Sequence, residues 1–167
     1  MRGNRLMPNA FDRLPLDMQA KLVDQLRIRR LTYTAALQRM YSNDTKVILI
    51  ADKPGPGRPT TPGFHHTPFC GMKFSSLWVN QLLVEAGIPE RHLLWFNSEL
   101  ANGEPLDPIH LQDLADKTFI ALGGNAGKYI TKHAPNMRYE RIHHPQFAKR
   151  FKAKEPYGLV ELIRRAL

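Results

Sequence analysis

Cysteine is nearly absent from this sequence, which contains only Cys70. A single thiol excludes an intramolecular disulfide and every four-cysteine metal or iron–sulfur site. Two histidine pairs, His65-His66 and His143-His144, lack the ligand spacing of a zinc site, because adjacent side chains point apart in extended backbone. We therefore expect no metal and no cofactor.

Long hydrophobic runs are also missing. No stretch approaches the roughly 18 apolar residues of a membrane span, and the longest clean apolar run, Val47–Ala51, has the length of a strand. The N-terminal residues lack the apolar segment of a secretory signal. We expect a cytoplasmic protein that does not enter a membrane.

Acidic residues are fewer than basic residues in this sequence. Asp and Glu number 15 against 24 Lys and Arg, which gives a formal net charge of +9. A basic surface suits a polyanionic partner, most simply nucleic acid, although many small proteins are basic for other reasons. The hydrophobic fraction of 43% is enough to bury a core and excludes wholesale disorder.

The length of 167 residues predicts one domain, with an N-terminal arm and helix over 1–45 and an α/β core over 46–167. Apolar residues at three- and four-residue steps predict a helix from Leu16 to Met40. The segment Arg27–Arg30 in this helix is interpreted either as a solvated face or as a phosphate contact.

Strand and helix patterns alternate from residue 46 onward, which predicts a three-layer α/β/α fold with a mainly parallel sheet of about four strands. The expected strands are 46–51, 93–96, 118–122 and 138–142. The expected helices are 75–86, 108–115, 125–132 and 157–167.

Polar residues follow three of these strands. The first strand runs into Asp52-Lys53, the second ends in Asn97, and the fourth ends in His143-His144. Parallel strands bring such residues to one crevice, where a carboxylate, an amide and an imidazole can activate water, bind a base edge and stabilise an anion. We expect Asp52, Lys53, Phe69, Asn97 and His144 to line one pocket.

Residues 47 to about 150 resemble the uracil-DNA glycosylase superfamily, most closely its small bacterial and archaeal members with a Gly-x-x-Pro-Gly motif. Five segments carry the resemblance, in the family's order. They are Ala51-Asp52-Lys53-Pro54-Gly55, Pro68-Phe69-Cys70-Gly71, Leu94-Trp95-Phe96-Asn97, Leu122-Gly123-Gly124-Asn125-Ala126 and His144-Pro145. The combination is more specific than any one motif alone.

The resemblance implies a role for each matching residue. Phe69 would stack on a flipped-out pyrimidine, Asn97 would hydrogen-bond its Watson–Crick edge, and His144 would donate to the pyrimidine O2 as negative charge develops. The loop after His144 would press into the minor groove and touch the backbone. The residues expected to contact DNA are Arg58, Gln146, Lys149, Arg150 and Lys152.

The first motif departs from the family pattern. Ala51 replaces the first Gly, and Lys53 occupies the position where many members have a water-positioning Asp or Asn. Some thermophilic members have an acidic residue one position earlier, which Asp52 matches; it is interpreted as a water-orienting carboxylate or as a plain turn residue. Lys53 is interpreted as a phosphate contact, as a nucleophilic amine forming a Schiff base, or as the mark of an enzyme acting on a base substituent.

These observations lead to a glycosylase-like hydrolase that excises uracil or a related modified pyrimidine from DNA by base flipping and water attack. Asp52, Lys53 and His144 are its expected catalytic residues. Two alternatives stay open: a transferase or processing enzyme acting on a modified pyrimidine in DNA, and an inactive DNA- or base-binding member. The expected partner is single- or double-stranded DNA, and the expected state is a monomer.

Overall fold

The computed structural model describes residues 11–52, 67–71, 74–99, 114, 116–151 and 157–167. Lys53, Arg58, His65, His66, Lys152 and nearly all of the expected helix 108–115 lie outside the described residues. No helix within the described ranges is long and apolar enough to cross a membrane.

Four parallel strands form the central sheet, as the sequence predicts. They are β1 (Val47–Ala51), β2 (Leu93–Asn97), β3 (Thr118–Leu122) and β4 (Tyr139–Ile142), in the spatial order β2-β1-β3-β4. All five residues of β1 are buried. A strand covered on both faces is expected to be continuously apolar rather than alternating, which accounts for the Val-Ile-Leu-Ile-Ala sequence.

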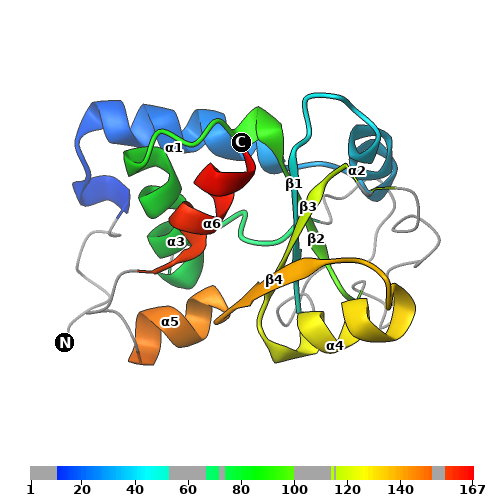
Figure 1. Cartoon of the computed structure of the whole chain (residues 1–167). Helices are drawn as coiled ribbons and strands as arrows, with labels where there is room; N and C mark the ends of the chain where they lie inside the picture. The colour runs from blue at the N-terminus through cyan, green and yellow to red at the C-terminus, as the bar shows by residue number, and fades with distance from the viewer. Residues whose placement is uncertain (1–10, 53–66, 72–73, 100–113, 115, 152–156) are drawn as a thin grey trace.

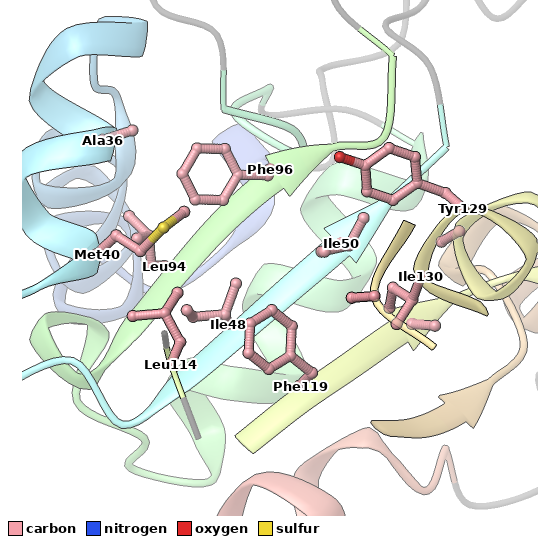
Figure 2. Packing of buried hydrophobic residues seen from close by; sticks show 13 residues of the cluster. Ala36, Met40, Ile48, Ile50, Leu94, Phe96, Leu114, Phe119, Tyr129 and Ile130 are labelled. Carbon is pink, nitrogen blue, oxygen red and sulfur yellow. The ribbon is translucent and has the colours of Figure 1, made fainter. Parts of the chain in front are cut away.

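The sheet separates two hydrophobic clusters because successive side chains of a strand point to opposite faces. Ile48 and Ile50 of β1 belong to one cluster, and Val47 and Leu49 belong to the other. Figure 2 shows the first cluster, in which Met40 and Ile130 come from two different helices that cover the same face of the sheet.

Helices cover both faces and complete the three layers (Figure 1). Those of the first cluster are α2 (Tyr33–Met40) and α4 (Gly124–His133), and those of the second are α3 (Phe74–Glu85) and α6 (Leu159–Ala166). The remaining helical elements are α1 (Leu16–Arg29), α5 (Pro145–Phe151) and the short 3-10 turns η2 (Phe11–Arg13) and η3 (Glu90–His92). Both α1 and α5 contact α3. The predicted three-layer α/β/α fold is confirmed.

The single helix expected from Leu16 to Met40 is wrong, because the chain forms α1 and α2 with a break between them. Arg30 leaves the helical conformation, with φ −73° and ψ 95°. Thr32 then caps α2, its Oγ1 accepting from the backbone N–H of Ala35 at 3.2 Å. Such a cap satisfies a donor that has no partner within the helix, so it favours a new helix start.

The loop expected after His144 is also wrong, because residues Pro145–Phe151 form α5. Proline suits the first turn of a helix, where its fixed φ is helical and its missing N–H has no intrahelical partner. In Figure 1, α4 follows the end of β3 and α5 follows the end of β4. Both helices therefore begin at the carboxyl-terminal edge of the parallel sheet.

Candidate active site

Asp52 and Asn97 lie at the carboxyl ends of neighbouring strands. The β1–β2 register pairs Ala51 with Asn97, and Asp52 is the next residue along the chain. The backbone N–H of Ser98 donates to the carbonyls of Ala51 and Asp52, both at 2.9 Å, and Ser98 Oγ donates to the Asp52 carbonyl at 3.1 Å. These three bonds fix the backbone from which the Asp52 carboxylate extends.

The Asp52 carboxylate faces the start of α4. Its Oδ2 accepts a hydrogen bond from Asn125 Nδ2 at 3.0 Å. Asn125 belongs to the Leu-Gly-Gly-Asn-Ala segment that the resemblance identifies, but its role as a partner of Asp52 is not contained in the motif. An anchored carboxylate can hold a water or face a developing cation, which are the functions expected of Asp52.

His144 follows β4, and its ring lies against Phe69. The two ring centroids are 5.3 Å apart, with an interplanar angle of 49°. Phe69 also meets Trp95 of β2 in an edge-to-face contact with the ring centroids 5.9 Å apart. The structure thus brings the imidazole of His144 and the expected stacking ring of Phe69 into contact, although 75 residues separate them in the chain.

Burial favours the neutral form of His144. Burial lowers the pKa of its imidazole below the ordinary value of 6.5, and the negative charge of Asp52 opposes this shift without cancelling it. The backbone N–H of Gln146 points at His144 Nδ1, with a distance of 3.1 Å between the two nitrogens. Because Nδ1 accepts that bond, the proton of the neutral ring resides on Nε2. His144 is therefore a neutral Nε2–H donor.

The backbone of Phe69 adopts an unusual conformation. Its φ of 57° lies in the left-handed region, which a bulky side chain rarely occupies. Two side chains donate to the Phe69 carbonyl, Arg29 through Nη1 and Asn80 through Nδ2, both at 2.9 Å. A strained backbone of this kind persists only when its surroundings hold it, and these two donors do so.

Arg29 is the centre of a buried polar cluster behind Phe69. Its side chain is almost fully buried and binds Glu90 through two hydrogen bonds, Nη2 to Oε1 at 2.7 Å and Nε to Oε2 at 3.2 Å. Its guanidinium carbon lies 4.2 Å from the Trp95 ring centroid, and Trp95 Nε1 donates to Glu90 Oε2 at 2.8 Å. Nη1 also donates to Asn80 Oδ1. We call Arg29, Asn80, Glu90 and Trp95 the Arg29 cluster.

The three arginines at the end of α1 have different environments, so neither interpretation of the basic run holds for all of them. Arg27 is exposed and pairs with Asp24 at 3.2 Å. Arg29 is buried in the Arg29 cluster, and Arg30 donates through Nη2 to the Cys70 carbonyl at 2.8 Å. Arg29, which is buried, and Arg30, which is exposed, therefore both hold the Phe69-Cys70 backbone.

Gly123 and Tyr157 shape the backbone around His144. Gly123 has φ 110°, and a Cβ built on it would lie 3.3 Å from the His144 Cβ. Tyr157 Oη donates to the His143 carbonyl at 2.6 Å, and burial raises the pKa of this phenol. Glycine at position 123 thus permits both the turn and the close approach of His144.

The expected site residues fall into three groups. Asp52, Asn97 and His144 stand at the carboxyl ends of three parallel strands, with Asn97 buried, and Phe69 joins them through the contact of its ring with His144. The expected DNA contacts within the described chain, namely Gln146, Lys149 and Arg150, are exposed on α5. Lys53, Arg58 and Lys152 lie outside the described residues. Within the described ranges, no group of three or more His, Cys, Asp or Glu side chains is arranged to hold a metal ion.

Comparison with known proteins gives a distant structural similarity. No protein-family model and no curated protein sequence matches the chain. Among solved structures, the crystal structure of SMUG2 from Pedobacter heparinus aligns with a TM-score of 0.40 and 15% sequence identity, over 75% of each chain.

Proposed function

We propose that this protein is a DNA glycosylase-like hydrolase that excises uracil or a related modified pyrimidine by base flipping and water attack. The observation that carries the proposal is the ring contact of Phe69 with His144, whose pKa is lowered by burial and raised by the nearby Asp52 carboxylate. An aromatic face, a neutral donor and a carboxylate are the groups that this reaction needs at one place.

His144 stabilises the departing base. Cleavage of the bond between the sugar C1′ and the pyrimidine N1 leaves negative charge on the base, and a donor aimed at that charge strengthens as the bond breaks. The backbone N–H of Gln146 donates to Nδ1 of His144, so Nε2 is the ring nitrogen that carries the proton and can donate it to the base. The loss of one such donor typically lowers the rate about 10²–10³-fold.

Asp52 acts on the sugar side of the reaction. The carboxylate faces the positive charge that develops at C1′ and orients the attacking water. The hydroxyl of that water bonds to C1′ and its proton goes to the released pyrimidine, so the products are an abasic site and a free base. Asn125 holds Asp52 Oδ2 and limits the rotation of the carboxylate.

Phe69 and Asn97 bind the flipped base. The Phe69 ring offers an aromatic face for stacking, and an amide carries both a donor and an acceptor for a pyrimidine edge. Trp95 packs edge to face against the Phe69 ring. Arg29 and Asn80 donate to the Phe69 carbonyl, so both the ring and the backbone of Phe69 are held. Such support favours a preformed base site.

The alternative activity is modification of a pyrimidine substituent in DNA by a transferase or processing enzyme. The observation that favours it is Lys53, which places an amine where many members of the uracil-DNA glycosylase superfamily have a water-positioning Asp or Asn. An amine there suits a nucleophile or an anion contact better than a water-activating base. An inactive DNA- or base-binding member is the third possibility.

Incubation with oligonucleotides that each carry one modified pyrimidine, read by mass spectrometry, separates these functions. A glycosylase releases the free base and leaves a strand with one water added in its place. A change in the mass of a base substituent, with the glycosidic bond intact, would establish the alternative activity. An unchanged mass for every oligonucleotide, with DNA still bound, would establish a binding protein. Asp52→Asn should slow excision strongly while leaving the affinity for DNA near that of the parent.

A further inference from the structure

Three exposed or partly exposed rings form a continuous row at the end of β4 and along α5. The rings of His143 and Phe147 are stacked with their centroids 4.8 Å apart and an interplanar angle of 29°. The rings of Phe147 and Phe151 follow at 4.9 Å. Phe147 and Phe151 are four residues apart on α5 and lie on the same face of the helix, and the His143 ring, which precedes the helix, stacks on Phe147. We call these three residues the aromatic row.

The aromatic row faces solvent rather than the core. Phe147 is 41% exposed and Phe151 is 64% exposed, although large aromatic side chains are normally buried in a protein of this size. The contact of Phe147 with Phe151, four residues apart on α5, gives only a small gain in helix stability. That gain does not explain two exposed phenylalanines, so the row has the character of a recognition surface.

The charge around the aromatic row is positive. Lys149 and Arg150 are exposed on α5, and the Arg150 guanidinium lies 5.8 Å from the Phe151 ring centroid. The segment 143–154 contains no Asp or Glu. Aromatic rings interleaved with basic side chains are the combination that binds single-stranded nucleic acid, since the rings stack on bases and the cations neutralise phosphates.

The aromatic row begins beside the candidate active site. His143 directly precedes His144, whose ring contacts Phe69. Tyr157 fixes the His143 carbonyl, so the backbone that joins the row to the site is held in place. A strand whose target base stacks on Phe69 would pass its neighbouring nucleotides toward His143 and then along α5.

We propose that His143, Phe147 and Phe151 form a stacking surface for unpaired bases of single-stranded DNA next to the target nucleotide. This inference rests on the proposed function, because it names the form of DNA that the same site uses. In a duplex the faces of the bases are covered by their neighbours, whereas an unpaired strand presents these faces to the exposed rings. The net charge of +9 and the basic residues of α5 complement its phosphates.

Fluorescence anisotropy with a labelled single strand that contains no modified base tests the surface without requiring chemistry. The doubly substituted variant Phe147→Leu with Phe151→Leu keeps apolar bulk on α5 and removes the rings. We expect its affinity for the single strand to fall roughly 5- to 150-fold, the range for loss of one stacked base, while the affinity for the same sequence as a duplex stays within about twofold. Tyr41→Leu is the matched control, since Tyr41 is an exposed aromatic at the end of α2.

The companion variant Lys149→Gln with Arg150→Gln tests the phosphate interactions. It should weaken the binding of both DNA forms and make the log–log salt dependence shallower, by about 0.7 for each phosphate of a single strand that is no longer neutralised. Thermal unfolding of each variant checks that α5 remains folded.

Three results would overturn the inference: equal losses for single strand and duplex in the leucine variant, no loss for either, or tighter binding of an RNA strand of the same sequence. If the leucine variant excises at the parental rate and binds single strands with unchanged affinity, the role of the aromatic row is refuted and the proposed glycosylase function stands. If the parent protein excises no base but loses affinity for single strands when the rings are removed, the stacking surface stands and the proposed glycosylase function is refuted.

Discussion

Removal of the Arg29 guanidinium is the perturbation whose effect the structure specifies best. Arg29→Met keeps the length of the side chain and deletes its charge and donors. Glu90 then retains the Trp95 indole N–H as a partner but loses both bonds from arginine, in a place where it is almost fully buried. The Phe69 carbonyl keeps the bond from Asn80 and loses the one from Arg29.

The expected cost follows from the burial of the pair. Breaking a buried ion pair by removal of one partner costs about 3–5 kcal/mol, because the remaining charge is left without compensation. In a protein of this size about 1 kcal/mol lowers Tm by roughly 2–4 °C, so Arg29→Met should lower Tm by about 6–20 °C. Arg29→Lys keeps the charge without the two-pronged geometry and should fall between the parent and Arg29→Met.

Arg27→Met is the matched control, two residues away on the same helix. Arg27 is exposed, and its pair with Asp24 is a surface pair worth about 0–1 kcal/mol. Chemical denaturation of the parent and the three variants gives the free energies of unfolding directly. If Arg29→Met and Arg27→Met were to differ by less than about 0.5 kcal/mol, the Arg29 cluster would not hold the Phe69 segment and the reasoning would be refuted.

The remaining predictions concern His144 and its surroundings. Gly123→Ala should destabilise the fold and displace His144, because φ is 110° and the new methyl would lie 3.3 Å from the His144 Cβ; unfolding curves and the histidine NMR signals report the two effects. Asp52→Asn should lower the pKa of His144 further, since it removes the charge that raises it, and an NMR titration that gave an unchanged or higher pKa would contradict this coupling. The folded protein binds the His144 proton less tightly than the unfolded chain, so stability should fall as the pH drops below about 6.5, and His144→Gln should reduce that fall.

The fold could be predicted because its strands carry local signals. The continuous apolar sequence of β1 indicates a strand buried on both faces, and Thr118–Leu122 forms β3 with the expected bounds. Helix breaks are harder, because they depend on a few backbone groups. The break before α2 rests on one cap from Thr32, and α5 starts with a proline that is equally typical of a loop.

The buried role of Arg29 could not be predicted from the basic run alone. Its partner Glu90 is 61 residues away, and only the folded chain brings the two together. The sequence does carry one signal: Arg29 continues the spacing of the buried residues Leu22 and Leu26, so it lies on the core face of α1. Such a position for a charged residue indicates a buried partner.

Part of the candidate site follows from the motif positions and part does not. The ends of parallel strands lie at one edge of a sheet, so the nearness of Asp52 and Asn97 is a consequence of topology. The partners that orient these groups are specific to this chain: Asn125 on Asp52, and the backbone N–H of Gln146 on His144. Hydrogen bonds of this kind depend on the exact approach of side chains, which residue spacing does not define.

The central claim is that the neutral His144 donates to a departing pyrimidine, and a single-turnover excision rate tests it most directly. The substrate is a single strand with one uracil, and the proteins are the parent, His144→Ala and the control His92→Ala, whose histidine precedes β2 at the opposite edge of the sheet. We predict that His144→Ala lowers the rate about 10²–10³-fold with little change in affinity, and that His92→Ala excises at nearly the parental rate. Equal rates for the parent and His144→Ala would contradict the claim.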